Sequence, residues 1–221
     1  MHIPDGFIAP QMYLPAYACA AGLWLHALRR VRAKLREETI PLMAVLTAVV
    51  FVLMSIALPL PGGTSAHASG VAILAILFGV RVGFLLMTLV LLLQALILGA
   101  GGITSLPINA LAIGGAGALA AVGSFRLLRG AGRPRREALA LITAGWVSVV
   151  VPAALVAIAL GVQPALAHAP DGTPRFFPFG LAITVPALVV PHLLVGVGEG
   201  ALTLLIYRLV ASRRNERAGW Q

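Results

Sequence analysis

The first two residues of the chain, Met1 and His2, carry three nitrogen atoms that could bind one metal ion together. The free α-amine, the amide nitrogen of His2 and the Nδ1 of its imidazole would close fused five- and six-membered chelate rings. These rings keep the donors nearly coplanar, so one further nitrogen completes a square plane, the geometry typical of Ni(II) and Cu(II) and accessible to Co(II). Removal of Met1 usually requires a small second residue, so we expect the chain to keep this methionine.

His67 is the best candidate for the fourth nitrogen. An isolated loop histidine is more often solvated or hydrogen-bonded than a metal ligand, and this applies to His67 taken alone. Gly62, Gly63 and Gly70 surround it, however, and glycines permit close approach of the backbone. The turn-forming sequence Pro4-Asp5-Gly6 can return the N-terminus toward the protein body. Together these features favour a site built from the N-terminus and His67.

The composition indicates that lipid surrounds most of the chain. Of the 221 residues, 60% are hydrophobic and 10% are charged, and the mean hydropathy is +0.98. The net charge of +9 comes from short basic clusters between long apolar runs, which fits membrane topology signals better than nucleic-acid binding. The sequence contains no HExxH, GxSxG or GxxxxGK[ST] motif, so we expect no enzyme and no ATP hydrolysis by this chain.

Seven apolar stretches are candidates for helices within the bilayer. They cover roughly residues 11–28, 40–58, 68–80, 82–98, 105–123, 138–162 and 179–207. The third and fourth are short and could form one long helix with Arg81 at its middle. A merged helix would place the basic clusters before residue 40 and after residue 125 on opposite sides of the membrane, against the positive-inside rule. Two short helices joined at Arg81 are therefore predicted.

The basic residues also set the predicted orientation. With seven spans, every arginine and lysine except Arg175 lies on one face, which the positive-inside rule assigns to the cytoplasm. The sequence thus predicts an all-α integral membrane protein with seven transmembrane helices, its N-terminus outside and its C-terminus cytoplasmic. We expect one transmembrane metal-binding domain over residues 1–221, with a chelating segment (1–10), a seven-helix bundle (11–207) and a basic cytoplasmic tail (208–221).

Further polar residues lie near the outer ends of the predicted spans. Gln94, Thr104, Ser105 and Asn109 flank the loop between the fourth and fifth spans, and Ser65 lies close to His67 in sequence. Their side chains are candidates to orient a ligating imidazole or to close a loop over the metal. The alternative is that they only satisfy backbone groups at helix ends.

Two pairs of residues have helical spacing. Ala44 and Ala48 are four apart in the second span, where small residues form a groove that lets another helix approach closely. His192 and Glu199 are seven apart in the last span and share one face. For this second pair we expect a buried polar contact between helices rather than a metal site. His168 lies in an outer loop and is expected to be solvated.

Four segments resemble a known family, the cobalt/nickel substrate-binding components (CbiM/NikM) of energy-coupling-factor (ECF) transporters. They are MHIPDGF, GGTSAHASG, LQALILGAGGITSLPINALAIGGAGA and PHLLVGVGEGALT. The resemblance implies that Met1 binds the metal through its amine, His2 through its amide and imidazole, and His67 through its imidazole. It implies Ni(II) or Co(II) as the transported substrate, no organic cofactor, and a location in the inner membrane of a prokaryote.

The resemblance also implies partner proteins. A transmembrane T component would dock on the helix face that carries Ala44 and Ala48, and two ATPase subunits would supply the energy. Because the sequence ends at Gln221, any small auxiliary membrane subunit is expected to be a separate chain. The rival hypothesis is a self-sufficient secondary transporter or channel for a divalent metal, which the near absence of charged residues in the spans disfavours.

Overall fold

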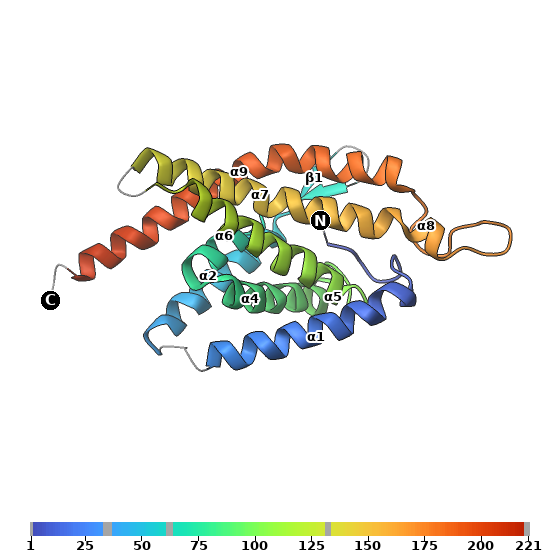
Figure 1. Cartoon of the computed structure of the whole chain (residues 1–221), viewed down its shortest axis with the longest axis horizontal. Coiled ribbons are helices and arrows are strands. Elements are labelled where there is room, and N and C mark those ends of the chain that lie inside the picture. The colour runs from blue at the N-terminus through green and yellow to red at the C-terminus, as the bar shows by residue number, and fades with distance from the viewer. Residues whose placement is uncertain (1, 33–36, 61–63, 131–133, 219–221) are drawn as a thin grey trace.

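The computed structural model describes residues 2–32, 37–60, 64–130 and 134–218, which form a bundle of helices (Figure 1). The elements are α1 (Pro10–Arg32), η1 (Glu37–Thr39), α2 (Ile40–Ser55), β1 (Leu58–Leu60), β2 (Thr64–Ala66), α3 (Val71–Phe78), α4 (Val80–Leu93), η2 (Gln94–Leu98), α5 (Leu106–Asn109), η3 (Ala110–Ala116), α6 (Gly117–Leu128), α7 (Pro134–Gly161), α8 (Gln163–Leu166) and α9 (Leu181–Ala218). Strands β1 and β2 pair in an antiparallel hairpin, and η2 and η3 are π-helical.

The helices are those of a multi-pass membrane protein. Within the described ranges, five helical stretches are long and apolar enough to cross a bilayer: Glu37–Ser55, Val80–Leu98, Leu106–Leu128, Pro134–Leu166 and Leu181–Ser212. All seven predicted stretches contain helix, but α1 is not among these five. At about 1.5 Å per residue, the eight residues of α3 reach only about 12 Å. Seven full spans and their orientation therefore remain predictions.

A glycine separates α3 from α4. Gly79 has φ +89°, in the left-handed region that favours glycine, and Arg81 lies in the first turn of α4. The predicted division into two helices is confirmed, with the break two residues before the predicted junction. Beyond this break, α4 packs against α3. The two backbones are so close at Gly83 that an added Cβ would be 2.9 Å from the Cα of Ala75.

Helices α7 and α9 also pack through glycines, along one side of the bundle (Figure 1). A Cβ on Gly145 would lie 2.6 Å from the Cα of Gly200, and one on Gly200 would lie 2.5 Å from the carbonyl oxygen of Ile142. Small residues at a helix interface let two backbones approach closely, which gains dispersion contacts where lipid offers no hydrophobic driving force. This contact fixes the position of α9 relative to the rest of the bundle.

The segment before α1 folds back from the start of that helix toward the centre of the molecule (Figure 1). Ile3 and Ile8 in this segment are buried and pack in a cluster with Ile108 and Val156. Residues 2–9 are therefore part of the packed structure, and they enter the bundle close to helices α5 and α7.

Candidate metal centre

The structure brings the two predicted histidine ligands together. His67 directly follows β2 and is 4% exposed. Its imidazole stacks on that of His2, with ring centroids 4.5 Å apart and an interplanar angle of 30°. The third predicted ligand residue, Met1, lies outside the described residues. The predicted contact between the N-terminal segment and the loop that follows β2 is thus present in the fold.

Asn109 holds the backbone of the residue that follows His2. The amide nitrogen of Ile3 donates to Asn109 Oδ1 at 3.0 Å, and Asn109 Nδ2 donates to the carbonyl oxygen of Ile3, also at 3.0 Å. The hydroxyl of Ser105 donates to the same carbonyl. Asn109 is 2% exposed, so water does not compete for these bonds. Asn109 and Ser105 therefore position the backbone beside His2.

Asp5 fixes the loop between η2 and α5 to the N-terminal segment. Its carboxylate accepts hydrogen bonds from the amides of Ile103 (3.0 Å) and Thr104 (2.7 Å) and from the hydroxyl of Thr104. Desolvation raises the pKa of Asp5, but these hydrogen bonds outweigh it and lower the pKa overall. At Gly102 a Cβ would lie 2.4 Å from the Asp5 nitrogen, so only glycine fits there.

Gln163 anchors the other end of the N-terminal segment. The amide of Ala9 donates to Gln163 Oε1 at 2.9 Å, while Gln163 Nε2 donates to the carbonyl of Ala159 at 2.7 Å. From sequence, Asp5 was identified only as a turn residue and Gln163 was not identified. The available signal for Gln163 was a glutamine placed directly after the long apolar run of α7, at the start of α8.

Glu199 holds the loop that carries His67. Its carboxylate accepts hydrogen bonds from the amide of Ser69 (2.8 Å), the hydroxyl of Ser69 (3.1 Å) and the amide of Gly70 (2.7 Å). Gly70 begins α3 with φ +64°, and a Cβ there would lie 2.4 Å from Val50 Cγ2. The contact is buried and polar, as predicted for Glu199, but its partners lie in the loop before α3 and not on another helix. It fixes the turn two residues after His67.

Burial keeps both imidazoles neutral. Desolvation is the main reason that the pKa of His2 falls well below its ordinary value, and the adjacent His67 lowers it further. Desolvation likewise lowers the pKa of His67 to about 3. Only a neutral imidazole offers a nitrogen lone pair to a metal. The pair is therefore in the protonation state needed for metal binding at neutral pH.

The other sequence candidates occupy separate places. Gln94 is buried and its Nε2 donates to the carbonyl of Phe51 at 3.4 Å, so it contacts α2. Ser65 lies in β2, but its side chain is outside the described part of the structure. His168 is exposed in the loop before α9, where its backbone pairs with that of Pro174 in an isolated antiparallel β-bridge. Ala44 is exposed on α2, as the docking prediction requires, and so is Ala48.

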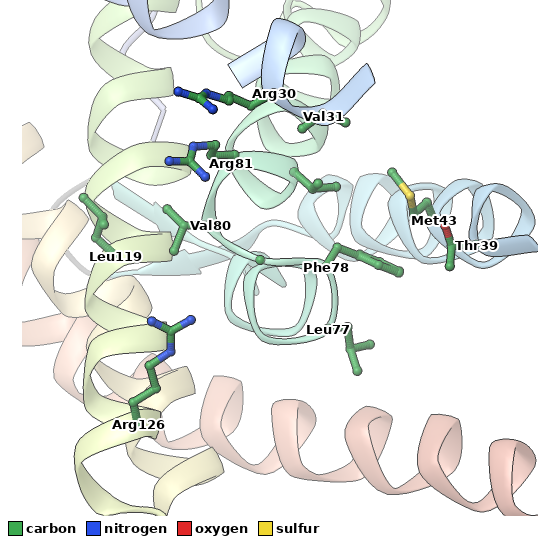
Figure 2. Close-up of a pocket in the computed structure, with 12 residues that line it drawn as sticks. Arg30, Val31, Thr39, Met43, Leu77, Phe78, Val80, Arg81, Leu119 and Arg126 are labelled. Carbon is green, nitrogen blue, oxygen red and sulfur yellow. The ribbon is translucent and has the colours of Figure 1, made fainter. Parts of the chain in front are cut away.

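Side chains alone do not make a metal site in the described ranges, where no group of three or more His, Cys, Asp or Glu residues could hold an ion. A hollow of about 700 Å³ lies between the C-terminal end of α1, the N-terminal ends of α2 and α4, and α6 (Figure 2). Arg30, Arg81 and Arg126 line it together with apolar residues such as Phe78 and Leu119. Three guanidinium groups repel a metal cation, so this hollow is not the metal site.

Known proteins match the chain over most of its length. The family model for CbiM, described as the cobalt uptake substrate-specific transmembrane region, matches residues 2–217. The chain is 35% identical to the probable fused nickel transport protein LarMN of Lactiplantibacillus plantarum, over 98% of this chain and 70% of that protein. It is also 35% identical to the fused nickel transport protein NikMN of Rhodobacter capsulatus, over 92% of this chain and 59% of that protein. A crystal structure of a truncated transition metal transporter, 33% identical, has a TM-score of 0.90 and covers 96% of this chain and 99% of that one.

Proposed function

The chain belongs to the CbiM family of cobalt uptake substrate-specific transmembrane regions, and from this premise we propose that it captures Ni(II) or Co(II) at the extracytoplasmic face of the membrane. Named relatives include nickel and cobalt transport proteins. The single observation that carries the proposal is the contact of His2 with His67 at the buried N-terminal segment. The metal is the transported substrate, so the site must both bind and release it.

The proposed donors are the α-amine of Met1, the amide and Nδ1 nitrogens of His2, and an imidazole nitrogen of His67. The stacked, neutral imidazoles support this set, and so do the hydrogen bonds that hold the segment on both sides of His2. Four nitrogen donors in a plane suit Ni(II) strongly and Co(II) acceptably. Asn109, Ser105 and Asp5 would keep the donors preorganised through the backbone.

Transport is proposed to need partner proteins. In this proposal the chain is the substrate-binding component of an ATP-driven ECF transporter, and separate ATPase subunits hydrolyse ATP. The T component would dock on the exposed face of α2 that carries Ala44 and Ala48. The chain spans 70% and 59% of the two fused nickel transport proteins that it matches.

Two extra residues test the N-terminal chelate. Adding two alanines before Met1 moves the free amine away from the amide of His2 and makes this histidine the fourth residue. The fused rings of Met1 and His2 can then no longer form, and the histidine is not third in the chain, where a free amine and two amides would again chelate Ni(II). We expect high-affinity Ni(II) binding by the purified protein to disappear, while helical content and the thermal unfolding temperature stay at parent values. The matched control adds two alanines after Gln221. Undiminished Ni(II) affinity in the N-terminally extended protein would refute the chelate.

A further inference from the structure

His192 has the hydrogen-bonding pattern of a metal-binding imidazole. It lies in α9, is 1% exposed, and its Nδ1 is 2.6 Å from the carbonyl oxygen of Leu188. A carbonyl can only accept, so Nδ1 carries the proton and Nε2 carries the lone pair. Metal-binding histidines are commonly fixed in this way, with one ring N–H donated to a backbone carbonyl and the other nitrogen facing the metal.

The lone pair of His192 is buried and unused. Its Nε2 atom has no hydrogen-bond partner among the described residues. Nearly all buried polar atoms in folded proteins are paired, because burial removes the water that would otherwise satisfy them. If the side chain at position 192 only filled space, an apolar side chain of similar size would do so without an unpaired nitrogen. The hydrogen bond to Leu188 fixes the tautomer of His192 and leaves its Nε2 nitrogen available. This arrangement indicates that Nε2 accepts a ligand that is not bound at all times.

The surroundings of His192 point to the metal centre. Glu199, two helical turns further along the same face of α9, holds Ser69 and Gly70 just after His67. Helix α9 also packs against β2, the strand that leads directly into His67. His192 lies about 16 Å along α9 from its first residue, Leu181, and thus well inside the bundle.

We propose that His67 and His192 form an inner pair of donors that takes the metal ion when the N-terminal chelate releases it. This inference rests on the proposed function and extends it from capture to release. The ion stays divalent throughout. The amide nitrogen of His2 takes up a proton from solvent as its bond to the metal breaks. Nε2 of His192 replaces one of the three lost donors, and water molecules occupy the other positions on the ion.

The test uses the protein with two alanines before Met1, in which the chelate cannot form and the inner pair remains. We expect this protein to bind Ni(II) and Co(II) weakly but measurably by calorimetry. Replacing His192 by Asn keeps an N–H donor for the Leu188 carbonyl but removes Nε2. In the extended protein, His192→Asn should weaken the residual binding by about tenfold or more, and it should shift the Co(II) absorption bands. His192→Gln, with similar volume and no imidazole, is a second variant in case the Asn protein does not fold.

The control is His26→Asn, which changes an exposed histidine near the far end of α1. It should leave residual binding unchanged. In the protein without the extension, His192→Asn should change Ni(II) affinity little, because the chelate dominates equilibrium binding. The inference is overturned if the extended protein binds no metal, or if His192→Asn and His26→Asn have equal effects there. Failure of the proposed function would look different, because the alanine extension itself would then leave affinity at the parent value.

Discussion

The side chain of Asn109 accepts a hydrogen bond from the backbone amide of Ile3 and donates one to its carbonyl oxygen. A neighbouring β-strand would satisfy the same two backbone groups. A neutral hydrogen bond contributes about 1 kcal/mol to stability, and leaving a buried partner unpaired costs more. These bonds restrain a segment that would otherwise be a free chain end. Part of the conformational entropy of the segment around Ile3 is therefore lost when the protein folds, before any metal binds.

Replacing His67 by Ala should leave the three N-terminal donors and open the fourth position. We expect Ni(II) affinity to fall by about tenfold to a hundredfold and the ligand-field absorption spectrum to change. The control is His168→Ala, because His168 is exposed in the loop before α9. A His67→Ala protein that binds and transports like its parent would show that another group, such as His168 or water, is the fourth ligand.

Metal binding should weaken steeply as the solution becomes acidic. Because burial lowers the pKa of His67 to about 3 and that of His2 well below its ordinary value, protons compete little for these imidazoles near neutral pH. The competition comes from the α-amine, with a reference pKa of about 8, and from the amide proton that the metal must displace. Affinity should therefore fall as pH drops from about 8 to 5, with proton release on binding.

Titrations of the purified protein with Ni(II), Co(II) and Zn(II) across that pH range check this prediction. Zn(II) has no ligand-field preference for a square plane and displaces amide protons poorly, so it should compete weakly. Equal Zn(II) affinity, or binding that does not change with pH, would mean that the backbone nitrogen is not a ligand.

The site could be predicted from sequence only where its residues are marked by position or local context. His2 follows the initiator, and His67 and Asn109 lie in segments that resemble a family. The part played by Glu199 could not be predicted, because Ser69 is 130 residues away and no spacing rule connects them. Gln163 was missed for the same reason, since Ala9, its partner, is 154 positions distant.

At the scale of elements, the contact between α7 and α9 supports the proposed metal centre, because Glu199 is next to Gly200, which lies in this contact. We expect Gly200→Ala to reduce both the unfolding temperature and the Ni(II) affinity, since its Cβ would meet the Ile142 carbonyl at 2.5 Å. The control is Gly198→Ala, two residues away in the same helix, where a Cβ has nothing within 4 Å. Equal behaviour of the two variants would show that this contact does not hold the site.

The exposed face of α2 should matter for transport and not for binding. Replacing Ala44 and Ala48 by Leu adds volume where another helix is proposed to dock. Metal affinity of the purified double variant should match the parent, while uptake and co-purification with the T component should fall. Val45→Leu, also on exposed surface of α2, serves as a control for added volume. Uptake at the parent level in the double variant would indicate that lipid covers this face.

The apolar runs of the sequence predict where the helices lie. They do not predict where a helix is broken or becomes π-helical. The break at Gly79 depends on a left-handed backbone at one glycine, whereas positive-inside reasoning drew attention to Arg81. The π-helical segment η2 precedes the loop that binds Asp5, and η3 follows that loop after the short helix α5. Their geometry depends on tertiary contacts, which hydropathy does not encode.

At the scale of the whole molecule, the rival hypothesis of a self-sufficient transporter makes a different prediction. If the chain only captures metal, cells that contain this chain without the T component and the ATPases should accumulate Ni(II) at background level. Adding the partners should restore uptake, and an ATPase variant that cannot hydrolyse ATP should abolish it. Ni(II) uptake by the chain alone in sealed vesicles would favour the secondary transporter or channel.

The long sequence separations within the centre also govern when it can form during synthesis. A ribosome makes the chelating residues first, yet Asn109 must emerge before Ile3 is held, and Glu199 before the turn after His67 is fixed. A nascent chain shorter than this has its first residues exposed with nothing to hold them in place. Under the proposed function, the segment that is synthesised first is thus the last to acquire its metal-binding geometry, and metal loading would report that α9 has been inserted.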